Sequence, residues 1–326
     1  MTISHAHGDA TQPESEALHV HAPVSADTSA RTLRQVARDY FILTKPSIIL
    51  LLLITTVPAM VLAADGWPGS GPVLATLLGG IMAAGGAGAV NMYIDRDIDA
   101  VMLRTRKRPI PAGRVPARHA LVFGLALGLG SGPWLWVTVN AISAVLALGA
   151  FAFYVVAYSL YLKRRTVHNT VLGGVAGAMP PLIGWAAVTG EASVQGLMLF
   201  FIVFFWQPPH FWALALGLAE DYRSAGIPMM PVVLGERETK RQTVLYSVLT
   251  FMVTLIFGAT AALGWLYFAV AIAGGLGFVW AAVRVARAPG AQGARPMFRY
   301  STLYLGALFL VMVLDSLLLE SLLPTF

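Results

Sequence analysis

Nine apolar stretches of about twenty residues each run through most of this 326-residue chain. A stretch of that length and character can cross the hydrocarbon core of a bilayer as a helix. The stretches lie near residues 47–64, 71–94, 119–138, 140–161, 169–189, 195–218, 243–263, 265–283 and 301–320. Only 12% of the residues are charged, about half the share found in soluble domains. The sequence therefore predicts an all-α membrane protein, a bundle of nine transmembrane helices.

The positively charged residues divide the connecting loops into two kinds. All 22 Lys and Arg residues lie in the N-terminal approach or in every second loop, and the intervening loops ADGWPGS, VTVN, TGEAS and LGW contain none. Positively charged loops stay on the cytoplasmic side of a membrane. We therefore expect a multi-pass protein of a bacterial cell (inner) membrane, with a cytoplasmic N-terminus and large loops. The net charge of +6 then reflects topology, and no nucleic-acid partner is expected.

The first 35 residues differ in composition from the rest of the chain. They are polar, and they lack the apolar core of a signal peptide. We expect a disordered polar tail at 1–35 and a transmembrane domain at 36–326; metal binding is the alternative role for the tail histidines His5, His7, His19 and His21. The chain contains no cysteine, which excludes disulfides and thiolate metal sites.

The second apolar stretch ends in the segment NMYIDRDIDAVMLRTRKRP, which places carboxylates at the edge of the predicted bilayer. Asn91, Asp95 and Asp99 recur every four residues and share one face of a helix, whereas Asp97 points away from that face. Oxygen ligands without His or Cys suit a hard cation. The pattern therefore predicts a Mg²⁺ site on this face.

Basic residues follow the carboxylates, and a second stretch ends in the same way. Arg104 and Arg108 are suited to binding phosphate groups. The sixth stretch runs into Glu220, Asp221 and Arg223 on the same predicted side of the membrane. Two such ends together suit a diphosphate held between bound metal ions. The alternative is that these acidic and basic side chains only pair with one another.

The segment NMYIDRDIDAVMLRTRKRPIPAG resembles the first aspartate-rich motif, N-x-x-x-D-x-x-x-D, of the UbiA superfamily of intramembrane prenyltransferases. Three further blocks narrow the resemblance to the members that farnesylate haem: LTKPSIILLLLITTVPA at 43–59, YSLYLKRRTVHNTVLGGVAGAMPPLIGWAAVTG at 158–190, and FFWQPPHFWALAL at 204–216. The resemblance covers about residues 38–320. It implies the nine-helix fold of that superfamily.

The resemblance also implies roles for individual residues. Asn91, Asp95 and Asp99 match the first Mg²⁺–diphosphate motif, and Asp221 matches the leading aspartate of the second. Ala225 stands where the closing aspartate of the second motif is found in much of the superfamily, which leaves a second metal ion open.

Three basic residues match diphosphate-binding positions of the family: Lys45, Lys163 and Arg164. Lys163 follows Tyr158 at a spacing one residue longer than in the Y-x-x-x-K motif of other members. With Arg104, Arg108 and Arg223, they complete the predicted diphosphate-binding set.

The implied reaction is the transfer of a farnesyl group from farnesyl diphosphate to the 2-vinyl group of haem B, with addition of water. The product is haem O, and Mg²⁺ is the implied cofactor. Two rival functions are a sister prenyltransferase acting on an aromatic quinone or chlorophyll precursor and a multi-span anion transporter. The sequence leaves open whether a haem A synthase binds the chain.

Two polar residues inside the predicted spans have two interpretations each. His210 is a candidate haem ligand, with Trp206 and Trp212 as haem-proximal aromatics, because an ionisable group inside a membrane is a functional candidate. The alternative is that His210 satisfies backbone carbonyls freed by the adjacent prolines. Asp315 either pairs within the bundle or lies near the outer interface.

Overall fold

A computed structural model describes residues 32–322, and this part of the chain consists of helices and loops without any strand. Residues 1–31, which include the tail histidines, lie outside the described part, and α1 already begins at Leu33. The helices are α1 Leu33–Leu43, α2 Pro46–Ala63, α3 Ser70–Ile94, α4 Arg96–Val101, α5 Ala117–Thr138, α6 Ala141–Ala152, η1 Phe153–Leu162, α7 Lys163–Arg165, α8 Asn169–Thr189, α9 Val194–Leu216, α10 Ala219–Ser224, α11 Met230–Val233, α12 Gly235–Thr260, α13 Trp265–Arg287 and α14 Ala294–Leu322.

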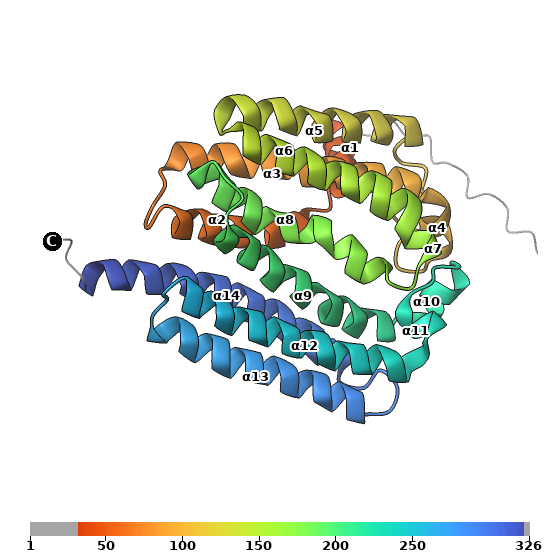
Figure 1. Cartoon of the computed structure of the whole chain (residues 1–326). Helices are drawn as coiled ribbons and strands as arrows, with labels where there is room; N and C mark the ends of the chain where they lie inside the picture. The colour runs from red at the N-terminus through yellow and green to blue at the C-terminus, as the bar shows by residue number, and fades with distance from the viewer. Residues whose placement is uncertain (1–31, 323–326) are drawn as a thin grey trace, which may run out of the picture. The chain divides into compact units, whose positions relative to one another are not determined.

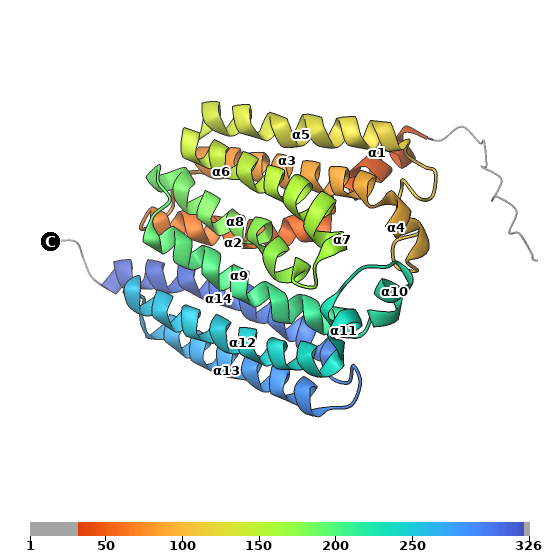
Figure 2. The same cartoon turned by 45° about the vertical axis from the view of Figure 1, so that its right-hand side comes forward.

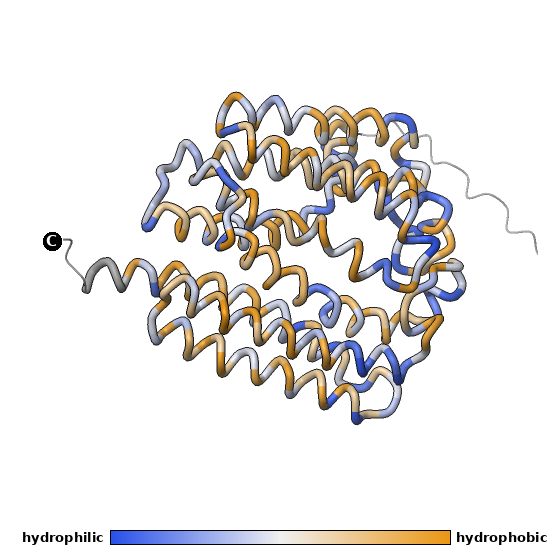
Figure 3. The backbone as a smooth tube through the Cα atoms, in the orientation of Figure 1, coloured by the Kyte–Doolittle hydropathy of each residue, from blue (hydrophilic) through white to orange (hydrophobic). Residues whose placement is uncertain are grey.

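Nine helical segments within residues 32–322 are long and apolar enough to cross a membrane, which confirms the predicted number. They are α2, α3, α5, the run α6–η1–α7, α8, α9, α12, α13 and α14. Figures 1 and 2 show these segments side by side in one bundle, with the short α4, α7, α10 and α11 gathered at one end. Hydrophilic segments are concentrated at that end (Figure 3). We refer to it as the charged end.

Two spans extend further at the charged end than hydropathy predicts. The expected starts were residues 243 and 301, but α12 begins earlier, at Gly235, and α14 begins earlier, at Ala294. The extra turns carry Lys and Arg side chains, which lower the hydropathy there without interrupting the backbone hydrogen bonds of a helix. Hydropathy finds the part of a helix that lies in lipid, so it misses turns that project beyond it.

Close contact between α3 and α5 depends on glycine, as the small-residue stretch GGIMAAGGAGA suggests. A Cβ atom added to Gly86 would lie 2.6 Å from the carbonyl oxygen of Gly124 and 2.7 Å from the Cα atom of Gly128. Small residues allow helix backbones to approach closely in a membrane. This contact fixes the position of α3, which carries the first acidic motif.

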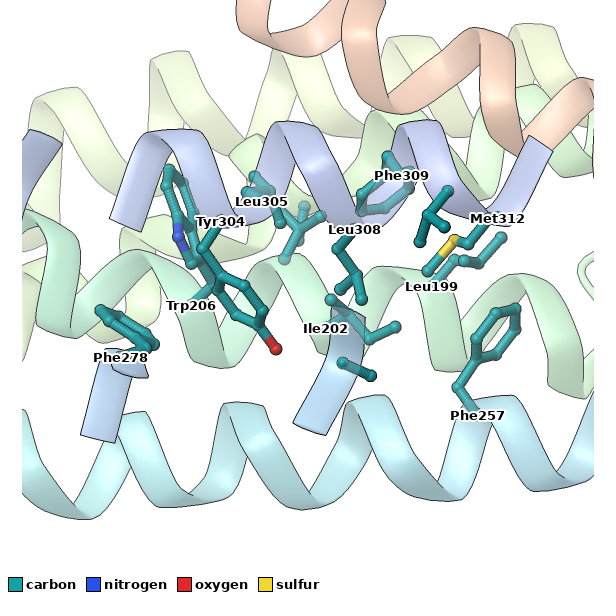
Figure 4. Packing of buried hydrophobic residues seen from close by; sticks show 14 of the residues in the cluster. Leu199, Ile202, Trp206, Phe257, Phe278, Tyr304, Leu305, Leu308, Phe309 and Met312 are labelled. Carbon is teal, nitrogen blue, oxygen red and sulfur yellow. The ribbon is translucent and has the colours of Figure 1, made fainter. Parts of the chain in front are cut away.

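The largest buried apolar cluster lies among α9, α12, α13 and α14 (Figure 4). Leu199, Ile202 and Trp206 of α9 pack against residues of α14 such as Leu305 and Phe309, with Phe257 and Phe278 from α12 and α13 beside them (Figure 4). This half of the bundle is therefore filled with side chains at the level of Trp206.

Asp315 of α14 caps a neighbouring helix. One carboxylate oxygen accepts a hydrogen bond from the backbone nitrogen of Gly264, and the other accepts one from the backbone nitrogen of Tyr267 at 3.2 Å. These backbone groups begin α13, where a helix leaves its first N–H groups without partners. Asp315 is 3% exposed, so of its two interpretations the structure supports pairing within the bundle.

Candidate active site

The first acidic motif lies at the charged end of α3 and has the predicted phasing. Asn91, Asp95 and Asp99 are 3%, 0% and 2% exposed, whereas the Asp97 side chain is 62% exposed. The backbone nitrogens of Asp95 and Asp99 each bond the carbonyl oxygen four residues earlier, at 2.9 and 2.7 Å. The chain therefore keeps a helical path from α3 into α4, and the four-residue spacing puts three oxygen-bearing side chains on the inner face.

Lys45, Asn91, Asp95 and Lys163 form a hydrogen-bonded network. The Asn91 amide nitrogen donates to Asp95 Oδ2 at 2.8 Å, and Lys163 also donates to this oxygen. Lys45 Nζ donates to Asn91 Oδ1 at 2.6 Å. Four predicted site residues are thus brought together from three regions of the chain: the end of α3, the turn between α1 and α2, and the residue after η1.

Lys45 has an unusual backbone conformation that directs it into this network. It lies between α1 and α2 with φ of 56°, a left-handed conformation that is rare for residues other than glycine. The turn fits closely against α3, because a Cβ atom on Gly88 would lie 3.1 Å from the Leu43 carbonyl oxygen. Burial lowers the pKa of the Lys45 ammonium to about 7, and the positive charges of Arg108 and Lys163 add to this effect. Strain of this kind is concentrated at functional sites.

Asp99 and Asp97 each bind an arginine. Arg108 donates to both Asp99 oxygens, at 2.9 and 2.7 Å, within the buried face. Arg164 donates to both Asp97 oxygens at 2.7 Å on the exposed side, and this hydrogen bonding lowers the pKa of the Asp97 carboxyl to about 2. Arg164 also lies 3.9 Å from Asp95 Oδ1. The pairing that the sequence offered as an alternative is therefore present. Whether the face can also bind a metal cation depends on the carboxylate oxygens that accept no hydrogen bond.

Two buried carboxylate oxygens accept no hydrogen bond within the described residues: Asp95 Oδ1 and Asp221 Oδ2. One comes from each predicted acidic motif. A buried anionic oxygen without a donor is costly unless a cation binds it. No group of three or more acidic or histidine side chains is close enough to form a metal site by itself in residues 32–322. Mg²⁺ needs only a few protein oxygens and takes its other ligands from water and phosphate, so the donor set fits this ion.

The second motif lies beside the first. Asp221 Oδ1 accepts a hydrogen bond from the backbone nitrogen of Leu103 at 2.8 Å, which joins α10 to the loop after α4. Ala225, at the end of α10, lines a surface hollow together with Asp97 and Arg164. Arg223 pairs with Glu220 on the surface, and Arg104 is also exposed. Neither arginine contacts the buried network in this structure.

An irregular helix, which the sequence did not predict, positions Lys163. The fourth span contains a π-helix, η1, in which the backbone nitrogen of Lys163 bonds the carbonyl oxygen of Tyr158 five residues earlier. This pattern accommodates the extra residue between Tyr158 and Lys163. That extra residue was the only sign of the π-helix in the sequence. Ser159 of η1, which sequence reasoning also missed, accepts a hydrogen bond from the Asn91 amide at 3.0 Å.

An apolar cavity of about 130 Å³ adjoins the network. It lies between α2, α3, α6–η1 and α8, and its walls are mainly Leu, Ile, Ala, Met and Phe side chains. Lys45 and Tyr154 line it, and Lys45 Nζ lies 5.9 Å from the centre of the Tyr154 ring. The cavity is thus apolar along its walls and has the Lys45 side chain where it meets the acidic motif.

The three candidate haem-binding residues lie outside this cavity, on α9. The His210 ring is stacked between Trp206 and Phe298, with centroid distances of 4.4 and 4.2 Å, and its Nδ1 lies 2.7 Å from Ser301 Oγ. Because the Ser301 hydroxyl donates to the Phe298 carbonyl, it accepts from Nδ1–H, and the lone pair of the ring is on Nε2. Trp206 and Trp212 are 1% and 0% exposed. A haem contact at either indole requires the surrounding helices to move.

Comparison with known proteins identifies the class. The model of the UbiA prenyltransferase family matches residues 52–303. The fold agrees: a solved digeranylgeranylglyceryl phosphate synthase superimposes with a TM-score of 0.71 at 15% identity, covering 86% of this chain and 99% of that one. A UbiA homolog from Archaeoglobus fulgidus bound to GPP and Mg²⁺ gives 0.63 at 18% identity, covering 84% and 99%. The chain belongs to the UbiA prenyltransferase family.

The curated relatives that follow share one name within this family. Relatives named protoheme IX farnesyltransferase are 50% identical in Symbiobacterium thermophilum, covering 86% of this chain and 95% of the relative, and 47% identical in Gloeobacter violaceus, covering 90% and 97%. A protein of the same name from Thermus thermophilus is 50% identical over 85% of this chain. The chain spans only 46% of the length of that relative.

Proposed function

We propose that this protein transfers the farnesyl group of farnesyl diphosphate to the 2-vinyl group of haem B and adds water, giving haem O and diphosphate. The observation that carries the proposal is the apolar cavity that meets a buried network of cations and carboxylates at Lys45. A prenyl diphosphate has the same division into a long apolar chain and a strongly anionic head. The names of the curated relatives support haem B as the acceptor.

The head group is assigned to the buried network. Lys45, Lys163 and Arg108 supply positive charge around it, and Asn91, Asp95, Asp99 and Asp221 are the residues to hold Mg²⁺. Bound there, Mg²⁺ supplies charge that neutralises the departing diphosphate. Lys45 and Lys163 stay bonded to Asn91 and Asp95 until the diphosphate competes for them. The site is therefore held together by ion pairs before the substrate arrives.

The reaction follows from this arrangement. The bond between farnesyl C1 and the diphosphate oxygen breaks, and the diphosphate keeps the electron pair. The vinyl π electrons of haem B form the new bond to C1, and water adds to the carbon next to the porphyrin ring with loss of a proton. The apolar cavity walls exclude water from the allylic cation until the acceptor attacks it.

The proposal is tested by incubating the purified protein with haem B, farnesyl diphosphate and Mg²⁺ and measuring the mass of the haem. We expect a gain of one farnesyl group plus one hydroxyl group, together with released diphosphate. Unmodified haem with a prenylated quinone or chlorophyll precursor would identify the sister activity instead. Anion flux into proteoliposomes without diphosphate release would identify a transporter.

We also propose that the charged end faces the cytoplasm of a bacterial cell, because Lys and Arg residues are retained on that side. The absence of native cysteine makes single-cysteine labelling clean. Gln292→Cys, in the loop between α13 and α14, should react with a membrane-impermeant thiol reagent only after the membrane is permeabilised. Glu191→Cys, between α8 and α9, should react in intact cells. The reverse labelling pattern would show that the protein has the opposite orientation in the membrane.

A further inference from the structure

The hydroxyl of Ser159 is bonded on both sides. It donates to the carbonyl oxygen of Tyr154, five residues earlier, at 2.8 Å, and it accepts a hydrogen bond from the Asn91 amide nitrogen at 3.0 Å. Ser159 is 0% exposed. Because its single hydrogen is used by Tyr154, the hydroxyl can only accept from Asn91.

This bond fixes which way the Asn91 amide faces. The two amide hydrogens point to Asp95 Oδ2 and to Ser159 Oγ, so the carbonyl oxygen Oδ1 faces Lys45. Turning the amide over would place Oδ1 against a carboxylate oxygen and against a hydroxyl that has no hydrogen left to donate. Asn91 therefore presents its oxygen, the only atom of the amide that binds a cation, away from Ser159.

The π-helix brings Ser159 to this position. Five-residue spacing in an α-helix separates side chains by about 140°, whereas the i→i+5 hydrogen bonds of η1 bring such residues closer to a common face. Tyr154 and Ser159 form one such pair, and Tyr158 and Lys163 form the next. The same irregular segment thus delivers Ser159 to Asn91 and Lys163 to Asp95. π-Helical segments are frequent at functional sites.

We propose that Ser159 is a positioning residue of the metal–diphosphate site. It acts through Asn91, whose Oδ1 it keeps turned toward the bound cation and diphosphate. The inference rests on the proposed function, because it assumes that Asn91 contributes to cation binding.

The test measures Mn²⁺ binding by electron paramagnetic resonance in the presence of a non-hydrolysable farnesyl diphosphate analogue. Ser159→Ala should weaken Mn²⁺ binding about fivefold, the effect of one buried hydrogen bond. Ser143→Ala is the matched control, since Ser143 is a fully buried serine of the same span whose hydroxyl has no partner in the described residues. It should bind Mn²⁺ as the parent protein does. Ser159→Thr, which keeps the hydroxyl, should recover most of the affinity and serves as the test if Ser159→Ala does not fold.

The outcomes separate this inference from the proposed function. If the parent protein binds Mn²⁺ and Ser159→Ala binds it equally well, Ser159 has only a structural role and the inference is wrong, whatever the change in melting temperature. The inference is also wrong if Ser159→Thr folds but binds Mn²⁺ at least about fivefold more weakly than the parent protein. If the parent protein binds no Mn²⁺ at all, the metal site itself is refuted and the inference falls with it.

Discussion

The buried pair between Asp95 and Lys163 allows its structural and chemical roles to be separated. Asp95→Asn keeps the shape of the side chain and removes its charge. The Asp95 and Lys163 side chains are 0% and 18% exposed, so the variant leaves an ammonium group poorly solvated and without its partner. Removing one member of a buried ion pair costs ~3–5 kcal/mol of folding stability. The surface pair of Glu220 and Arg223, with side chains 82% and 55% exposed, should cost ~1 kcal/mol or less in Glu220→Gln.

The second variant combines Asp95→Asn with Lys163→Met, which removes both charges. Replacement of a whole buried pair by uncharged groups is often neutral, so the double variant should recover most of the lost stability. Thermal unfolding in detergent measures this recovery. Farnesyl transfer should remain at least ~100-fold below the parent rate in both variants, since the groups that stabilise the leaving diphosphate are lost. A folded double variant with near-parental turnover would show that Asp95 and Lys163 only support the fold.

Three further predictions follow from the geometry. Asp97→Asn should lower turnover only slightly, because Asp97 is exposed and faces Arg164 rather than the buried face; a loss as large as that of Asp95→Asn in the same haem mass assay would overturn the assigned phasing. Gly80 lines the cavity, has no atom within 4 Å of an added Cβ, and lies eleven residues before Asn91, or about 16 Å along α3. Gly80→Phe should therefore raise the KM for farnesyl diphosphate more than that for the shorter geranyl diphosphate. An equal change in both KM values would show that the farnesyl group binds outside this cavity. His210→Ala should lower the melting temperature by removing a stacked ring and, if Nε2 binds haem iron, should also shift the Soret band of bound haem; an unchanged band with normal haem affinity would leave His210 a packing role alone.

The sequence predicted the features that depend on lipid and on local spacing. Nine apolar runs gave nine spans within residues 32–322, because each run must satisfy its backbone hydrogen bonds within a helix. The four-residue recurrence of Asn91, Asp95 and Asp99 gave their common face because the backbone stays helical through Asp95. Both results follow from local patterns in the sequence, which can be identified without knowing the tertiary contacts.

What the sequence could not provide depends on contacts between distant segments. The π-helix is visible in the sequence only as one extra residue before Lys163, and its position depends on how η1 packs against α3 and α8. Asp315 appeared as an unexplained charge because its partners, the first N–H groups of α13, are about fifty residues away. Arg164 and Arg108 were predicted as diphosphate ligands, with ion pairing as the alternative, and only the fold shows that they pair with Asp97 and Asp99.

The most direct test of the proposed site is a structure of the protein with a non-hydrolysable farnesyl diphosphate analogue and Mn²⁺, whose anomalous signal locates the ion. We predict a Mn²⁺ peak bonded to Asp95 Oδ1, the diphosphate against Lys45 and Lys163, and the farnesyl chain in the cavity between α2, α3, η1 and α8. A farnesyl chain bound outside that cavity, or a Mn²⁺ ion without Asp95 among its ligands, would contradict the central claim that this buried network binds and activates the prenyl diphosphate.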